Sequence, residues 1–187
     1  VNELNRIVVD YTWRWSPALQ FIKNSIKCAR IGISRYCNLC ISAHLADWHP
    51  WESYQDFFMS SKALGGGALL DESHWIDQMI WFFGMPEYIY GLVDKVSDLD
   101  ITSDDSVDII ATYKSGLKVN IHLDIYGRPH EKSIKLIGSN GRISWEESSN
   151  VVETITDTGT SYNNVFNMSR DEIFCNVARE FMDVIGG

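Results

Sequence analysis

Apolar residues recur with two different periods along this chain. In the first part of the chain they stand three or four residues apart, a spacing typical of helices with one apolar face. Ser16-Pro17 supplies an N-cap and a first-turn residue for one helix, and Gly84 can end another. The pattern predicts helices over residues 16–28, 51–64, 71–83 and, near the end of the chain, 170–184.

Beyond residue 84 the apolar residues alternate with polar ones or cluster in short runs rich in β-branched and aromatic side chains, which favours strands. Lys114-Ser115-Gly116 and Ser139-Asn140-Gly141 fit hairpin turns. Strands are predicted over residues 6–11, 33–45, 88–96, 106–113, 117–126, 132–137, 142–145 and 151–155. Helices followed by an antiparallel meander predict an α+β fold, with the helices packed on one face of a mostly antiparallel open sheet. In the strand over 117–126, alternation gives that sheet one apolar and one mixed face.

Charge and composition narrow the function classes. The chain has 187 residues, a formal net charge of -9 and 45% apolar residues, which fits one sizeable domain with a core. Its acidity and the lack of a dense basic run argue against a nucleic-acid partner. No apolar run reaches the length of a membrane span, and the first residues resemble no signal peptide, so a cytoplasmic protein without a membrane partner is expected.

The four cysteines give no sign of a metal or redox centre. Cys37 and Cys40 form a C-x-x-C within a predicted strand, where residues three apart point to opposite faces. We interpret the cysteines as small buried thiols in a reducing compartment, with no metal site.

The stretch over residues 65–84 carries the best candidate chemistry. Its three consecutive glycines allow a tight turn and a close approach to a neighbouring segment or ligand. Asp71, His74 and Asp77 follow at three-residue intervals, so they share one face if helical geometry begins by Asp71. A histidine that titrates near neutrality and is oriented by a carboxylate suits removal of a hydroxyl proton.

Several segments together resemble a known family. Residues 65–77, Gly-Gly-Gly-Ala-Leu-Leu-Asp-Glu-Ser-His-Trp-Ile-Asp, closed by Trp-Phe-Phe-Gly-Met-Pro at 81–86, resemble the signature of the Gfo/Idh/MocA family of NAD(P)-dependent oxidoreductases, in its substrate-binding C-terminal domain. Residues 11–19 look like the family's crossover from its nucleotide-binding domain, and 134–143 like its sheet hairpin. Residues 47–54 resemble members associated with bacterial surface-sugar pathways.

The resemblance implies one half of a two-domain enzyme. Residues 1–15 would be the end of, or the crossover from, a Rossmann domain that is missing here, and residues 16–187 a substrate-binding and oligomerisation domain. That Rossmann domain would hold most of the NAD or NADP, since no G-x-G-x-x-G follows a strand in this chain. The expected reaction is hydride transfer to or from a sugar or sugar derivative. The resemblance also implies a homodimer or homotetramer formed through the open sheet face, and a fragment that is inactive alone.

Site roles carry over by matching positions. His74 matches the family's catalytic histidine, and Asp77 matches the aspartate three residues after it. Asp71 matches the preceding acidic position, although three residues separate it from His74 here and many members have four. We expect substrate contacts from Arg14, Trp15, Trp48 and His49, and cofactor contacts from Gly66 and Gly67. Arg14 fits an ion pair with an acid at the domain junction equally well.

Two other functions fit parts of the sequence. The sequence has enough imidazole and carboxylate groups for the metal site of a metal-dependent hydrolase, although no H-x-x-x-H pair supports one. These groups belong to His44, Asp47, His49, Asp71, His74 and Asp77. The tryptophans could instead stack on sugar rings in a carbohydrate-binding module without catalysis, although such aromatics more often pack in cores and interfaces.

Overall fold

The computed structural model describes residues 9–167 and 169–186. It contains helices α1 (Pro17–Lys27), α2 (Ala68–Asp71), α3 (His74–Phe83) and α4 (Arg170–Gly186). The strands are β1 (Ser34–Ser42), β2 (Tyr88–Asp94), β3 (Ser106–Thr112), β4 (Lys118–Asp124), β5 (Glu131–Gly138), β6 (Gly141–Glu146), β7 (Val151–Thr156) and β8 (Ser161–Val165). The strand predicted over 6–11 falls partly on residues 6–8, which lie outside the described residues; residues 9–11 form no strand.

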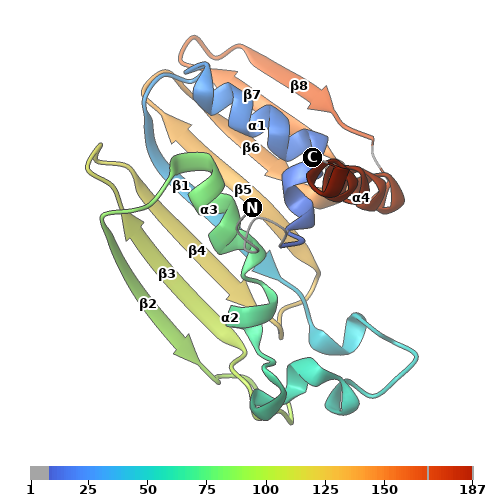
Figure 1. Cartoon of the computed structure of the whole chain (residues 1–187). Helices are drawn as coiled ribbons and strands as arrows, with labels where there is room; N and C mark the ends of the chain where they lie inside the picture. Colours follow the sequence, from blue (N-terminus) through green and yellow to red (C-terminus); the bar gives the residue numbers. More distant parts are fainter. Residues whose placement is uncertain (1–8, 168, 187) are drawn as a thin grey trace.

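The eight strands form one open sheet in the order β2-β3-β4-β1-β5-β6-β7-β8 (Figure 1). β1 runs parallel to β4 and antiparallel to β5, and the remaining neighbours are antiparallel. The α+β fold with a mostly antiparallel open sheet is therefore confirmed. The strands do not form a simple meander, because β1 comes in from the helical part of the chain and separates β4 from β5.

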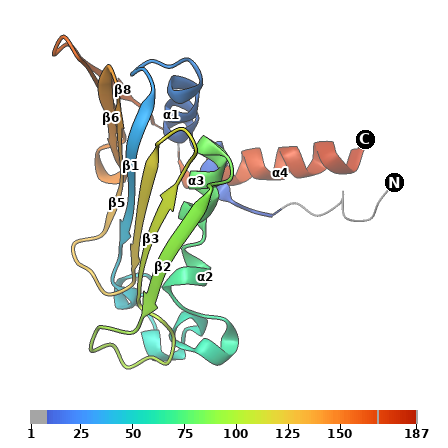
Figure 2. The same ribbon diagram turned by 90° about the vertical axis from the view of Figure 1, so that its left-hand side faces the viewer.

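The hydrophobic core lies between one face of this sheet and helices α1 to α3. Seen edge-on, these helices stand on the same side of the sheet (Figure 2). Val119, Ile121 and Leu123 on β4 are fully buried beneath them, as the alternation predicts. From the helix side, Leu19 of α1 and Met79 of α3 are equally buried. Sheet and helices thus form two layers around one core.

Helix α4 departs from this two-layer arrangement. It projects away from the helix-covered side of the sheet (Figure 2), and its described side chains are half-exposed or exposed. Trp15 ties the helix to the start of the chain, since its indole Nε1 donates a hydrogen bond of 2.9 Å to Glu180 Oε2. The other helices bury one face, whereas α4 keeps apolar residues such as Phe181 exposed.

Residues 51–64 contradict the prediction of one amphipathic helix. They form three single 3-10 turns instead, Tyr54–Asp56, Phe58–Ser60 and Lys62–Leu64. Ser60 explains part of this difference, because its hydroxyl donates to the Gln55 and Phe57 carbonyls and so competes with helical hydrogen bonds. The apolar positions consequently split, with Met59 buried and Leu64 exposed.

The C-x-x-C pair follows the strand interpretation. Cys37 points into the core and is fully buried, while Cys40 on the opposite face is half-buried. Both thiols are free, and burial raises the pKa of Cys40 to about 11. The expectation of buried thiols is wrong for Cys28 and Cys175, which are exposed. Among the helices in the described part of the chain, none has the length and apolar character needed to cross a membrane.

Candidate active site

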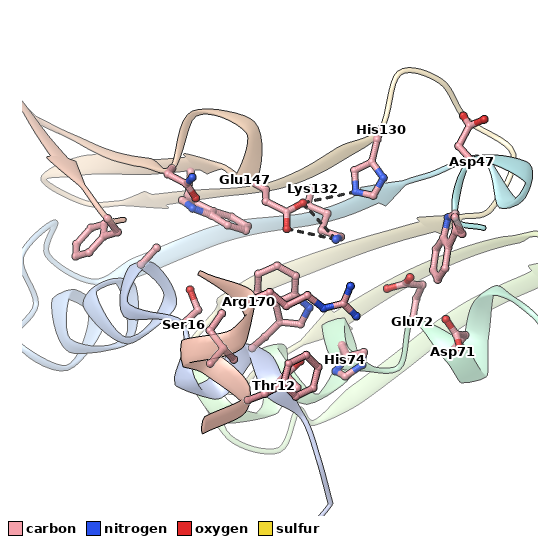
Figure 3. Close-up of a pocket in the computed structure, with 18 of the residues that line it drawn as sticks. Thr12, Ser16, Asp47, Asp71, Glu72, His74, His130, Lys132, Glu147 and Arg170 are labelled. Atoms are coloured by element: carbon pink, nitrogen blue, oxygen red, sulfur yellow. Dashed lines mark hydrogen bonds and ion pairs between the residues drawn. The ribbon is translucent and has the colours of Figure 1, made fainter. Parts of the chain in front are cut away.

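Many polar and charged side chains line a pocket of about 580 Å³. One wall comes from the segment that joins α2 to α3, and the other from β5, β6 and the turn after β6 (Figure 3). The start of α4 and the turn before α1 close one end. The pocket lining includes Thr12, Trp13, Trp48, His49, Asp71, Glu72, His74, His130, Lys132, Trp145, Glu147 and Arg170.

His74 is the first residue of α3 and lines the pocket. The Tyr11 ring packs edge-on against its imidazole, with 5.4 Å between the ring centroids. Burial lowers the pKa of His74, partly offset by the charge of Asp77. Its Nδ1 is buried and has no hydrogen-bond partner among the described residues. His74 is therefore a neutral imidazole near pH 7, able to accept a proton.

Two consecutive carboxyl groups lie beside His74. Asp71 ends α2, and burial raises its pKa. Glu72 follows in a non-helical conformation and is only 5% exposed, and burial raises its pKa to about 7. The pocket thus holds acidic groups that retain protons more readily than carboxyls in water.

Lys132 and Glu147 face this acidic wall from the sheet side (Figure 3). Lys132 Nζ lies 3.2 Å from Glu147 Oε2 and 5.0 Å from the centre of the Trp13 ring. His130 Nε2 lies 3.5 Å from the same carboxylate oxygen. Arg170, the first residue of α4, also lines the pocket. This wall therefore carries both positively and negatively charged side chains, and its lysine, Lys132, is paired with Glu147.

Trp48 and His49 of the substrate-binding prediction also line this pocket. The Trp48 indole donates a hydrogen bond of 3.3 Å to the Ala43 carbonyl, which fixes its ring. His49 Nδ1 lies 2.5 Å from Glu52 Oε1, and its ring stacks on Trp51 with 5.0 Å between centroids. Both aromatic groups are held in place by neighbouring side chains or backbone.

Arg14 and Asp77 meet in a second pocket. The Arg14 guanidinium donates two hydrogen bonds to the Asp77 carboxylate, at 2.8 and 2.5 Å, and Trp15 lines the same cavity. Asp77 is 8% exposed, so this is a buried carboxylate matched by a forked donor. The expected common face of Asp71, His74 and Asp77 is not formed, because α2 ends at Asp71 and α3 begins only at His74. Asp77 acts on His74 through its charge, and its carboxylate is held by Arg14.

Gly66 and Gly67 make their close approaches to this chain itself. A Cβ on Gly66 would lie 2.3 Å from the Phe58 carbonyl oxygen, and one on Gly67 would lie 2.3 Å from an Asp104 carboxylate oxygen. Gly67 also has a φ of +125°, which side chains other than that of glycine rarely allow. Packing against residues 58–59 explains Gly66, while the Asp104 carboxylate and the positive φ explain Gly67. Contact of either glycine with a cofactor stays a prediction.

The imidazole and carboxylate groups considered for a metal do not converge. The described residues contain no group of three or more His, Cys, Asp or Glu side chains that could hold a metal ion. Asp47 accepts two hydrogen bonds of 2.7 Å from Arg128, and His44 Nδ1 accepts one from the Ala46 amide. These groups have other partners, so the metal-hydrolase interpretation gains no support.

Sequence reasoning missed several of the polar pocket residues, among them Glu72, Lys132 and Glu147. Glu72 stands between two candidate residues, but a helix beginning at Asp71 would turn it away from His74. Lys132 and Glu147 lie on strand β5 and in the turn after β6, far from the signature in sequence. One available signal was the cluster of ionisable residues at 130–132 and 146–147, where two strands pair.

Comparison with known families agrees with this architecture. The sequence model described as GFO/IDH/MocA C-terminal domain matches residues 29–144, more than half of the chain. The chain therefore belongs to the Gfo/Idh/MocA family and carries its C-terminal domain. A comparison with curated proteins gives no match.

Solved structures share the fold at low sequence identity. A levoglucosan dehydrogenase in complex with NADH and levoglucosan has a TM-score of 0.78 and 14% identity, over 95% of this chain and 56% of that one. An inositol dehydrogenase homologue from Azotobacter vinelandii, complexed with NAD+, has a TM-score of 0.72 and 12% identity, over 87% and 44%. The WlbA dehydrogenase from Bordetella pertussis, in complex with NADH and UDP-GlcNAcA, has a TM-score of 0.60 and 16% identity, over 85% and 46%. The chain spans about half the length of these structures.

Proposed function

We propose that this chain is the substrate-binding and proton-transferring half of an NAD(P)-dependent oxidoreductase that acts on a hydroxyl or keto carbon of a sugar or sugar derivative. Residues 16–187 form this half, and residues 1–15 lead from a Rossmann domain that holds most of the cofactor. The observation that carries the proposal is His74, a neutral imidazole lining a polar pocket. Family membership supports the same chemistry.

In this proposal His74 handles the hydroxyl proton. Oxidation of an alcohol removes that proton and a hydride from the carbon that carries the hydroxyl group. The lowered pKa of His74 leaves its imidazole free to accept the proton at neutral pH, and Asp77 stabilises the imidazolium that results. Asp71 lies on the same wall and can accept a hydrogen bond from a second hydroxyl. The nicotinamide, when bound, takes up or returns the hydride.

The described residues fit the nicotinamide end of such a cofactor better than its phosphates. His74 lines the pocket and supplies the proton acceptor that hydride chemistry needs. A pyrophosphate requires free backbone N–H groups at a glycine turn or helix start. Here Gly66 and Gly67 pack against residues of their own chain. A proton acceptor without a phosphate-binding turn supports a cofactor that is held mainly by another domain.

The pocket lining supports a hydroxyl-rich substrate. Trp13, Trp48 and Trp145 provide flat apolar surfaces, and carboxyl, ammonium and imidazole groups between them can bind several hydroxyls. Two of the structures that share the fold hold levoglucosan or UDP-GlcNAcA. We extend from them only the class of ligand, a sugar or sugar derivative.

We also propose that two or four copies associate through the open face of the sheet. Tyr90 and Leu92 on β2 and Ile110 on β3 expose large apolar side chains there. Directly paired residues share a face, and Ile110 lies opposite both Tyr90 and Asn120 in the register. Exposed apolar groups arranged across neighbouring strands are typical of an interaction surface.

The test uses the full-length polypeptide that contains this chain. Nicotinamide absorbance is followed against a panel of sugars, sugar acids and nucleotide sugars, with NAD and NADP in turn. His74→Ala should lower kcat by about 10²-fold to 10⁴-fold, with a smaller change in KM. His130→Ala serves as the matched control, since it removes another pocket imidazole, one whose Nε2 lies 3.5 Å from a Glu147 oxygen, and its effect on kcat should be much smaller.

Two results would contradict the proposal. If the full-length protein neither binds a nicotinamide nor oxidises or reduces any sugar, the oxidoreductase assignment fails, and sugar affinity without turnover would favour a carbohydrate-binding module. If turnover occurs but His74→Ala and His130→Ala lower kcat equally, the proton acceptor is another group.

A further inference from the structure

Glu72 places a buried carboxyl group in the pocket from the short segment between α2 and α3. It lies between α2 and α3, with φ of -90° and ψ of 18°. The side chain is 5% exposed, yet it lines the cavity and faces Lys132 and Glu147 across it (Figure 3). The break between the two helices therefore delivers a carboxyl group to the interior of the site.

The surroundings of the Glu72 carboxyl favour its protonated form. Burial is the main cause of its raised pKa, and the neighbouring carboxylate of Asp71 raises the pKa further. Lys132 opposes them, but that ammonium is already paired with Glu147, 3.2 Å away. Near neutral pH Glu72 is therefore balanced between a carboxylic acid and a carboxylate.

A purely structural acid would have a partner here. Buried carboxyl groups in proteins are nearly always paired or hydrogen-bonded. No ion pair within residues 9–167 and 169–186 involves Glu72, and the one side-chain hydrogen bond that acts on its pKa comes from Trp75. Glu147 on the opposite wall is paired with Lys132 and lies 3.5 Å from His130 Nε2. A substrate that fills the pocket would supply a contact on the cavity side of Glu72, where the protein provides no ion pair.

We propose that Glu72 is a second catalytic residue of this pocket, one that binds the reacting substrate oxygen as a neutral carboxylic acid. This inference rests on the proposed function. During alcohol oxidation the O–H proton passes to His74, the C–H hydride passes to the nicotinamide, and a C=O bond forms. Glu72 keeps its proton and donates a hydrogen bond to the oxygen, which stabilises the negative charge that develops there. In the reverse direction the same hydrogen bond polarises the carbonyl.

The proposal predicts the shape of the pH profile. His74 must be deprotonated, so kcat/KM rises with pH up to the lowered pKa of that residue. Glu72 must be protonated, so kcat/KM falls above a pKa of about 7, by about tenfold per pH unit. The wild-type profile is therefore bell-shaped, and the two limbs belong to two different residues.

Glu72→Gln tests this assignment in the full-length protein. Glutamine resembles the neutral acid in shape and keeps a hydrogen-bond donor, but it does not ionise. The variant should retain activity within about tenfold of wild type near pH 6 and lack the high-pH limb, so that it exceeds wild type near pH 9. Glu147→Gln is the comparison variant. It removes a neighbouring carboxylate that raises the pKa of Glu72, so the high-pH limb should persist but move to lower pH.

Either of two results would overturn the proposal. A high-pH limb that is unchanged in Glu72→Gln would show that Glu72 does not carry it. Loss of activity at every pH would show that the carboxylate itself is required.

A second readout does not depend on turnover. Carbon-13 NMR of protein labelled at glutamate side-chain carboxyls should show one resonance that titrates near pH 7 and is absent from Glu72→Gln. A Glu72 carboxyl that titrates near the ordinary value of about 4.3 would overturn the proposal even where no substrate is known. Failure of the proposed function appears instead as wild-type protein without nicotinamide-dependent turnover, so the two failures are distinguishable.

Discussion

Stability of this domain should depend on pH through one histidine on the open sheet face. His122 on β4 lies between two carboxylates, with Nδ1 2.8 Å from Asp108 Oδ1 and Nε2 3.1 Å from Asp124 Oδ2. The hydrogen bond to Asp124 and then that to Asp108 raise the pKa of His122 to about 9, although burial opposes the change. The imidazole is therefore a cation in the folded protein at pH 7.

The size and sign of the effect follow from linkage. A pKa raised from about 6.5 in the unfolded chain to about 9 corresponds to at most about 3 kcal/mol. The His122 side chain is 34% exposed, so solvent screening reduces the contribution to about 1–2 kcal/mol. Because the folded-state pKa is the higher one, this stabilisation is fully present below about pH 6.5 and is lost as the pH rises towards 9.

His122→Gln is the perturbation, since it removes the charge and keeps a polar side chain. Denaturant unfolding of the domain, followed by the fluorescence of its seven tryptophans, should show a loss of about 1–2 kcal/mol near pH 6 and a smaller one near pH 10. Asp108→Asn offers a graded comparison. Asp108 is the more exposed partner of His122, whereas Asp124 also accepts backbone hydrogen bonds from Tyr126 and Gly127. Loss of the Asp108 charge should therefore reduce the pH dependence only in part.

One outcome would refute this reasoning. If the imidazole of His122, followed by NMR, titrates near 6.5, the two carboxylates do not hold the proton. A destabilisation by His122→Gln that is equal at pH 6 and pH 10 would likewise show that the side chain acts through packing.

Two further predictions concern the second pocket and the open sheet face. Arg14→Ala leaves the buried Asp77 carboxylate without its forked donor and should cost about 2–3 kcal/mol in unfolding free energy, whereas Arg14→Lys keeps the charge and should cost less; equal losses would contradict the forked geometry. Ile110→Asp places a charge on the open sheet face and should shift sedimentation towards the monomer, while Leu64→Asp, at an exposed position off the sheet, should not; unchanged assembly in both would exclude this face.

The alternating strands are the part of the fold that the sequence predicts best. A two-residue period predicts that β4 has one buried apolar face and one mixed face. Val119 and Ile121 lie on the buried face, as this period predicts. Strand β1 was also predicted, but its place beside β4 was not. Local periodicity says nothing about which strand a segment pairs with.

Two segments show where local patterns fail. Strand β8 was not predicted, because Ser161-Tyr162-Asn163-Asn164-Val165 is mainly polar and forms a strand by pairing with β7 at the sheet edge. Residues 51–64 have the apolar spacing of a helix, yet tertiary contacts compete with it, since the Ser60 carbonyl accepts a hydrogen bond from the Thr102 amide and the Met59 carbonyl one from the Ser103 hydroxyl. Both segments obtain their structure from distant partners.

The candidate site was only partly predicted because local spacing does not show where a helix is interrupted. A three-residue spacing of Asp71, His74 and Asp77 indicates one shared face only if the helix is continuous. The structure ends α2 at Asp71 and restarts helical geometry at His74, with the Trp75 amide bonded to the Glu72 carbonyl between them. Asp77 is thereby held against Arg14, and Glu72 enters the pocket beside His74. If this break is what assembles the site, inserting one residue after Glu72 should remove the pH limb assigned to Glu72 while the sheet remains folded.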